Sequence, residues 1–305
     1  MVVTLANPGM PSGGFVEDSK SAILEQLRSS GHVADFKLIS SDLSAVEKLQ
    51  AFDQAHAALG ESYPIVLKPD TGERGRGVLI AQSRQEVIAY LLACKLPVIV
   101  QKHIPGIEYG VFYERSPLNE NGSITGITLK GNTTVTGDGI NRLERLILAD
   151  SRAVCMAPLF LKMHAAHLDK ILPEGEIFRL NSLGTHSQGS VFFDHSHLIT
   201  PELILAIDAA TKHFAGFHIG RYDIRVPSEE DLKAGRNWQI VELNGVTSEP
   251  THMYDPRHGL WYAWRCLAAQ WTRAFQYGAE NRNFGHRPIS FARLRERLNS
   301  HKARI

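Results

Sequence analysis

Two short segments in the second half of the chain decide its fold class, Gly220-Arg-Tyr-Asp-Ile-Arg225 and Gln239-Ile-Val-Glu-Leu-Asn244. Apolar and polar residues alternate along the first segment and over 241–244 of the second, which is typical of β-strands with one buried face. Because alternate residues of a strand share a face, the polar residues of each segment point the same way. If the strands pair, they gather three hard oxygen ligands of the kind that Mg²⁺ prefers: Asp223, Glu242 and Asn244. The alternative is a surface hairpin with ordinary polar residues facing solvent.

A glycine-rich segment in the first half, Lys68-Pro-Asp-Thr-Gly-Glu-Arg-Gly-Arg-Gly-Val78, lies between two apolar runs that read as strands, 63–68 and 78–81. Glycines let backbone N–H groups approach an anion without interference from side chains, and three are present: Gly72, Gly75 and Gly77. The segment is not a Walker loop, because no Gly-Lys-Ser/Thr follows. It is not a dinucleotide fingerprint either, because it leads into a strand. A plain glycine-rich hairpin is the alternative, and Lys68 at the end of the first strand favours a phosphate site.

Helices and strands interleave along the chain, which predicts an α+β fold. Helical spacing of apolar residues predicts helices at 19–31, 42–59, 84–94, 141–148, 154–171, 201–214, 259–276 and 291–298. Pro158 is expected to break or to start the helix at 154–171. Further strands are expected at 97–104, 109–113, 124–129, 176–180, 189–193, 219–226 and 238–243.

Further segments with the composition of ligand sites follow one another in chain order. Lys20 stands in Asp18-Ser-Lys-Ser21, ahead of a predicted helix. A strand and loop read Val98-Ile-Val-Gln-Lys-His-Ile-Pro-Gly-Ile-Glu108. Thr136-Gly-Asp-Gly139 precedes another helix, and Arg179-Leu-Asn-Ser-Leu-Gly-Thr-His186 follows a strand. Together with the segments above, this order resembles the ATP-grasp superfamily from about residue 18 to residue 256, and most closely the carboxylate–amine ligases such as D-alanine–D-alanine ligase and the glutathione and cyanophycin synthetases.

The resemblance implies ATP and Mg²⁺ (or Mn²⁺) as cofactors. Lys20 and Lys68 match the family's nucleotide lysines, and the glycine segment matches the flap over the phosphates. The segment around Gln101 matches the hinge that holds adenine, and the acid at Glu108 would bind ribose. The full set of implied cofactor-binding residues is Lys20, Lys68, Gly72, Gly75, Gly77, Gln101, Lys102, Ile104, Glu108, Lys130 and Asn181. The implied metal ligands are Asp223, Glu242 and Asn244, and the implied catalytic residues are Arg221, Lys68 and Arg179.

The sequence departs from the family in three places. Gln101 replaces a glutamate that many members carry, and an amide can still accept a hydrogen bond from adenine. Gly245-Val-Thr-Ser-Glu-Pro250 replaces the turn of the D-alanine ligases beside the second substrate. Fewer than twenty residues precede Lys20, so the usual N-terminal pre-grasp domain is expected to be absent or truncated.

The resemblance also predicts how the chain divides. We expect a loop or pre-grasp remnant at 1–17 and a small ATP-grasp subdomain with a helical lead-in at 18–115. The large subdomain is expected at 116–257 and C-terminal helices at 258–305. The two subdomains would grip the nucleotide between them.

Composition narrows the function classes. Lys and Arg number 33 against 32 Asp and Glu, so no bulk positive field favours nucleic acid or a membrane surface. No apolar run approaches the roughly 20 residues that span a bilayer, and the start does not read as a secretory signal. The three cysteines, Cys94, Cys155 and Cys266, form no CxxC pair, which favours free thiols and a cytoplasmic location.

Two groups of histidines, 164/167 and Asp194-His-Ser-His197, are expected to be solvated rather than zinc ligands. The tryptophans of the 259–276 helix are expected in the core or in a subunit interface, so a homo-oligomer is possible.

The resulting hypothesis is an ATP-dependent ligase that joins a small-molecule carboxylate to an amine through an acylphosphate. Two alternatives stay open: an ATP-grasp kinase that phosphorylates a hydroxyl group, and a nucleotide-binding module without turnover.

Overall fold

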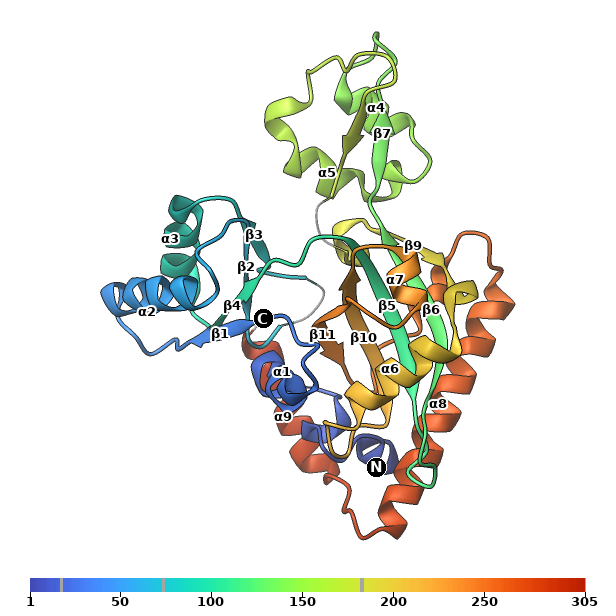
Figure 1. Ribbon diagram of the computed structural model, residues 1–305. Coiled ribbons are helices and arrows are strands. Elements are labelled where there is room, and N and C mark those ends of the chain that lie inside the picture. Colours follow the sequence, from blue (N-terminus) through green and yellow to red (C-terminus); the bar gives the residue numbers. More distant parts are fainter. Residues whose placement is uncertain (17–18, 73–74, 182–183, 305) are drawn as a thin grey trace.

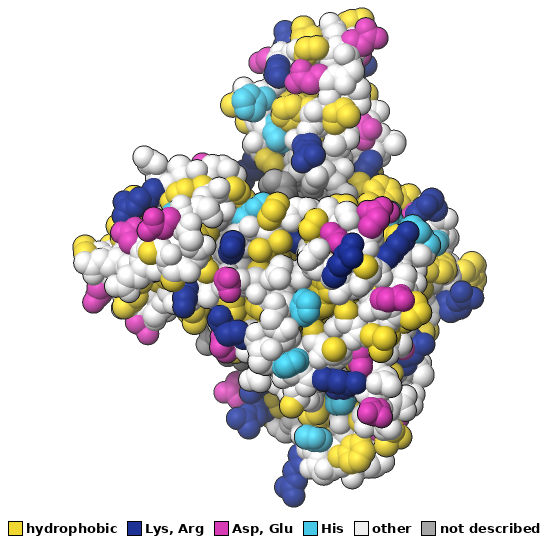
Figure 2. Space-filling model, viewed as in Figure 1, with side chains coloured by type: hydrophobic (Ala, Val, Ile, Leu, Met, Phe, Trp, Pro, Cys, Tyr) yellow, Lys and Arg dark blue, Asp and Glu magenta, His cyan; other side chains and the backbone are white. Residues whose placement is uncertain are grey.

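A computed structural model describes residues 1–16, 19–72, 75–181 and 184–304 (Figure 1). The expected α+β class is confirmed, with an ATP-grasp-like arrangement of two main sheets. No helix in the described ranges is long and apolar enough to span a membrane. In the space-filling view, the part built on the four-stranded sheet and the part around 134–180 project as separate lobes from the body (Figure 2).

The body is built on a five-stranded antiparallel sheet, and its strand order follows from the pairing of distant segments. In spatial order the strands are β11 (Gln239–Asn244), β10 (Ile219–Val226), β5 (Ile107–Glu114), β6 (Ser123–Gly131) and β9 (Val191–Asp194). The apolar residues of β10, such as Tyr222 and Ile224, are fully buried on one face. They pack in a core with α1 (Lys20–Leu27) and α6 (Pro201–Thr211). The polar residues of the same strands therefore lie on the opposite face.

The second sheet has four strands in the order β1 (Phe36–Ile39), β4 (Val98–Lys102), β2 (Ile65–Pro69) and β3 (Leu79–Ala81). One face packs on α2 (Ala45–Ala58) and α3 (Arg84–Ala93) around Phe52 and Leu91. The boundary expected at residue 115 needs correction, because β5 pairs with β10 and β6 in the five-stranded sheet. The change of sheet therefore falls between Lys102 and Ile107.

Residues from about 134 to 180 form a third part with its own small core, which the expected division into two subdomains does not contain. It holds the two-stranded sheet β7 (Thr134–Thr136) and β8 (Ile177–Arg179), with α4 (Leu143–Ala149) and α5 (Ala157–Met163). The helical stretch expected at 154–171 is shorter than expected, and Pro158 marks its start, one of the two roles expected for this proline. Pro158 lies in the first turn of α5, and 3₁₀ turns flank that short helix on both sides.

The C-terminal segment contains α8 (Leu260–Asn283) and α9 (Phe291–Arg304), with the short α7 (Glu229–Lys233) earlier in the chain. The start of the chain, expected to be loop, includes the 3₁₀ helix Val2–Leu5, which packs on α8. Of the tryptophans on α8, Trp271 packs near Phe15, whereas Trp261 is 81% exposed. Trp261 therefore does not lie in the core, and the alternative expectation of a subunit interface stays a prediction.

Candidate functional site

A cavity of about 800 Å³ opens where all three parts of the molecule meet. Its wall includes α1, the β2–β3 connection, the polar face of the five-stranded sheet and the 3₁₀ helix Ala153–Met156. The described lining residues include six cationic side chains, those of Lys20, Lys68, Arg76, Lys130, Arg152 and Arg221. They include three carboxylates, those of Asp223, Glu242 and Glu249. This excess of positive charge suits a polyanionic ligand.

The register of β10 and β11 brings the two predicted strand segments together. Asp223 lies opposite Glu242, and Arg221 lies opposite Asn244, so all four side chains share the cavity face. Arg221 Nε donates to Asp223 Oδ1 at 3.0 Å, and Asn244 Nδ2 donates to Asp223 Oδ2 at 3.3 Å. The register shifts between Asp223 and Ile224, where the pairing passes from Glu242 to Ile240, but the oxygen donors before this irregularity form one cluster.

A lysine from β6 completes the centre of this cluster. Lys130 Nζ lies 2.9 Å from Asp223 Oδ2 and 2.9 Å from Glu108 Oε1. Burial alone would raise the pKa of Asp223, but the Arg221 guanidinium and the Lys130 ammonium hold it below its usual value. Burial alone would lower the pKa of Lys130, but Asp223 and Glu108 raise it above its usual value. The Asp223 carboxylate and the Lys130 ammonium are therefore both charged at neutral pH.

Gly110 on β5 makes the room that these side chains need. It lies opposite Asp223 in the sheet, and a Cβ there would stand 3.1 Å from Arg221 Cδ and 3.5 Å from Asp223 Oδ1. Contacts at 3.1 Å force a neighbour to shift. The missing side chain therefore lets Arg221 lie flat against the sheet beside its carboxylate.

Two lysines, from α1 and β2, line the cavity next to β11. Lys20, the first residue of α1, donates to the carbonyl oxygen of Gly72 and lies 3.6 Å from Glu242 Oε1. Lys68 on β2 is buried and donates to Gln101 Oε1 at 2.8 Å and to the Val241 carbonyl at 2.9 Å. Burial lowers the pKa of Lys68 to about 8, although Glu242 acts in the opposite direction.

The glycine-rich connection between β2 and β3 covers the cavity from the side of the four-stranded sheet. Gly75 and Gly77 have φ of 68° and 70°, in the left-handed region that favours glycine. A Cβ on Gly75 would stand 2.9 Å from Thr185 Oγ1, so this connection reaches the segment that follows the third part. Residues 73 and 74 of the predicted flap lie outside the described residues.

The predicted hinge residues lie beside the cavity rather than in its wall. Gln101 is buried against Lys68, the side chain of Lys102 is exposed, and the carbonyl of Ile104 accepts from Arg225 Nη1 at 3.0 Å. Glu108 Oε2 accepts from Arg225 Nη2 at 3.0 Å. Burial alone would raise the pKa of Glu108, but Lys130 and Arg225 hold it below its usual value.

Two predicted site residues are not brought to the cavity, which corrects the expectation for the segment 179–186. Arg179 pairs with Thr134 in the two-stranded sheet and has an exposed side chain. Asn181 is buried, and its Oδ1 accepts from the Thr133 N–H at 2.7 Å. Pairing within the third part thus fixes both residues. Residues 182 and 183 and the side chain of 186 lie outside the described part.

The structure adds cavity residues that sequence reasoning missed, in particular Arg152, Glu249 and Tyr254. Arg152 comes from the third part, and its Nη2 donates to the Ser190 carbonyl at 3.1 Å. Arg225, outside the wall, follows the alternation of Arg221 and Asp223 on β10. That alternation could have identified Arg225, whereas Arg152 carries no local signal.

The donors present fit a divalent ion shared with phosphate oxygens. Within the described ranges, no group of three or more His, Cys, Asp or Glu side chains could hold a metal ion by itself. The set at β10 and β11 offers two carboxylates and one amide, which leaves coordination positions for phosphate oxygens. The six cationic side chains of the cavity suit the negative charge that a nucleoside triphosphate keeps after a divalent ion has bound.

Comparison with known proteins gives distant relatives. No family model matches the chain. It is 27% identical over 240 residues to a cyanophycin synthetase of Synechocystis sp., covering 70% of this chain and 26% of that protein. It is 28% identical over 220 residues to the cyanophycin synthetase of Geminocystis herdmanii, covering 65% of this chain and 24% of that protein. The chain thus spans about a quarter of the length of these relatives.

Two solved structures of ligases have a fold similar to that of this chain. The D-alanine–D-alanine ligase of Bacillus anthracis matches with a TM-score of 0.48 at 16% identity, covering 95% of this chain and 70% of that one. The VanG D-Ala:D-Ser ligase of Enterococcus faecalis matches with a TM-score of 0.48 at 11% identity, covering 87% and 61%.

Proposed function

We propose that this chain, which belongs to the ATP-grasp ligase superfamily as a distant homologue of the cyanophycin synthetases, is an ATP-dependent carboxylate–amine ligase. One observation carries the proposal. Asp223 and Glu242 lie opposite each other on β10 and β11, with Arg221 and Asn244 beside them, on the wall of a cavity that Lys20 and Lys68 also line next to β11.

ATP would lie in this cavity with its phosphates against the two lysines and the β10–β11 cluster. Mg²⁺, held by Asp223, Glu242 and Asn244, would neutralise charge on the phosphate oxygens. Three lysines and the N–H groups of the glycine connection would hold the rest of the triphosphate: Lys20, Lys68 and Lys130. The chain supplies no covalent nucleophile in this reaction, so its contribution is positioning and charge neutralisation.

The reaction would take two steps. An oxygen of the substrate carboxylate attacks the γ-phosphorus, the bond to the β–γ bridging oxygen breaks, and ADP leaves with that electron pair. The amine, which enters as an ammonium ion, loses one proton to solvent, and its nitrogen then attacks the acyl carbon. The carbon–oxygen bond to phosphate breaks, inorganic phosphate leaves with that electron pair, and the nitrogen releases a second proton to solvent as the amide forms. Arg221 would stabilise the negative charge that develops on the transferring phosphoryl group.

Trapping the acylphosphate with hydroxylamine tests the proposal. Protein, Mg²⁺ and ATP are incubated with a panel of amino acids, N-acetylated amino acids and dicarboxylic acids, each with hydroxylamine. A hydroxamate formed together with ADP, and lost in Asp223→Asn, supports a ligase. ADP with a phosphorylated alcohol and no hydroxamate would replace the proposal with a kinase. No turnover across the panel would replace it with a nucleotide-binding module.

A further inference from the structure

We propose, on the basis of the function proposed above, that Glu249 binds the ammonium group of the amine substrate and that Tyr254 positions Glu249 for this role. The substrate class that follows is an amine that enters the cavity with a positive charge. Neither residue belongs to the nucleotide or metal groups of the site.

The position of Glu249 and Tyr254 in the cavity is the first support for this role. Glu249 and Tyr254 both line the cavity, five and ten residues beyond Asn244 at the end of β11. Arg221 joins Glu249 to the metal donors, because its Nε donates to Asp223 Oδ1 and its Nη1 donates to the Glu249 carbonyl, both at 3.0 Å. Glu249 therefore lies on the far side of Arg221 from Asp223, next to the place where the phosphoryl group would be transferred.

The charge of the Glu249 carboxylate is the second support for this role. Asp223 is paired with Lys130 and Arg221, and Glu242 is paired with Lys20. The Glu249 carboxylate, by contrast, forms no ion pair with any side chain in the described ranges. In a cavity with six cationic side chains, a cationic group is repelled elsewhere and is attracted to this carboxylate.

The orientation of the Glu249 carboxylate is set by Tyr254. The Tyr254 hydroxyl donates to Glu249 Oε2 at 2.5 Å. Burial raises the pKa of Tyr254 well above its usual value, and Glu249 raises it further, so the hydroxyl stays a donor. With Oε2 held by Tyr254, Oε1 is left to accept a hydrogen bond from a ligand.

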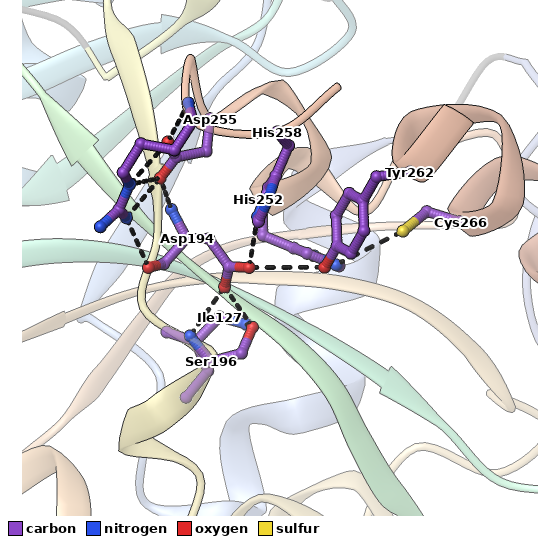
Figure 3. A network of polar contacts seen from close by, with 9 residues as sticks. Ile127, Asp194, Ser196, His252, Asp255, His258, Tyr262 and Cys266 are labelled. Atoms are coloured by element: carbon purple, nitrogen blue, oxygen red, sulfur yellow. Dashed lines mark hydrogen bonds and ion pairs between the residues drawn. The ribbon is translucent and has the colours of Figure 1, made fainter. Parts of the chain in front are cut away.

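A network of polar contacts around Asp194 holds the segment that carries Glu249 and Tyr254 in place (Figure 3). The segment that carries Glu249 and Tyr254 continues into Asp255 and His258. The Asp194 N–H donates to Asp255 Oδ2 at 2.6 Å, and His258 Nε2 lies 2.7 Å from Asp194 Oδ2. Both contacts tie the segment to the end of β9, so Tyr254 is held in place before a substrate arrives.

The test compares a charged nucleophile with an uncharged one in Glu249→Gln. Hydroxylamine is mostly uncharged at neutral pH and traps the acylphosphate without an ammonium group. With a carboxylate that gives hydroxamate in the wild type, we expect kcat/KM for the amine to fall on the order of 10²-fold, mainly through KM. Hydroxylamine trapping should fall by about threefold at most, so the preference for the amine should drop by at least about 30-fold. Tyr254→Phe should shift the same ratio in the same direction, by about tenfold or less. Glu120→Gln, an exposed carboxylate on the β5–β6 connection, is the matched control.

Three outcomes would overturn the inference and leave the proposed function in place. An equal fall in both reactions would assign Glu249 to the phosphoryl-transfer step. A raised requirement for Mg²⁺ in Glu249→Gln would make it a metal ligand. An unchanged ratio in a folded variant would leave it without a role in amine binding. Absence of hydroxamate in the wild type would overturn the proposed function itself, and the inference with it.

Discussion

Two clusters of charged side chains stand on the same five-stranded sheet and differ in what surrounds them. The cavity cluster around Asp223 has more cations than carboxylates and faces about 800 Å³ of open volume. The network around Asp194 joins its carboxylate and that of Asp255 to Arg257 and His258. None of these four residues lines the cavity.

The contrast separates charges that await a ligand from charges that hold the fold. In the Asp194 network each carboxylate already accepts several hydrogen bonds, and Asp255 alone receives two side-chain donors of Arg257 and the Asp194 N–H. In the cavity, the six lysines and arginines outnumber the three carboxylates. A phosphate group can therefore pair with these cationic side chains without leaving one of them buried and unpaired. A substitution should therefore affect turnover in the first cluster and stability in the second.

The largest effect is expected for Arg221→Ala. Loss of a positioned cation beside the transferring phosphoryl group should lower kcat on the order of 10² to 10³. The measurement is ADP release at saturating ATP, with circular dichroism to show that the fold is intact. Near-normal turnover in a folded variant would remove Arg221 from the catalytic group and weaken the contrast between the clusters.

The sequence predicted the cavity cluster better than the Asp194 network, for a physical reason. Strand alternation places Arg221 with Asp223, and Glu242 with Asn244, whatever the rest of the fold does. The contact between Asp194 and His258 joins residues 64 positions apart, on β9 and before α8, and no local pattern encodes it. The expectation for the segment 194–197 concerned its histidines alone and gave no role to Asp194, which accepts from Ser196, His258 and Tyr262.

The same limit explains the displaced boundary at 115 and the misplaced Arg179. The strand 107–114 was predicted nearly in full, but which sheet it joins depends on its pairing with β10, which lies more than a hundred residues later. Arg179 reads as an active-site residue in sequence because it follows an apolar run. Its pairing with Thr134 places it in a separate two-stranded sheet, and it is not among the described residues that line the cavity.

The next effect is on stability. Asp255→Asn removes the charge that receives Arg257 and leaves a weaker acceptor for the Asp194 N–H, in a side chain that is fully buried. We expect the free energy of unfolding to fall by about 1 to 3 kcal/mol. Urea denaturation measures this change, and KM for ATP should stay within about twofold. A large rise in KM for ATP with unchanged stability would contradict the structural assignment of this network.

A smaller effect concerns pH and separates Lys68 from the other cavity cations. Because the pKa of Lys68 is about 8 in the free protein, its charge is lost as the pH rises through that value. Phosphate binding favours the charged form, so nucleotide affinity should fall by up to about tenfold per pH unit above pH 8. Calorimetric titration with ADP between pH 7 and 9.5 measures the slope. Lys68→Arg should flatten it, because arginine keeps its charge, whereas the exposed Lys37→Arg should not.

The smallest effect is expected where only space is changed. In Gly110→Ala the new Cβ would stand 3.1 Å from Arg221 Cδ, so the guanidinium must move by a few tenths of an ångström while every charge of the cluster is kept. We expect kcat to fall severalfold, less than in Arg221→Ala, since misplacement weakens a positioned cation without removing it. Gly259→Ala is the matched control, because a Cβ there meets nothing within 4 Å. Equal activity in Gly110→Ala and Gly259→Ala would mean that the close packing of Arg221 on β5 does not matter for turnover, and that charge alone distinguishes the cavity cluster from the Asp194 network.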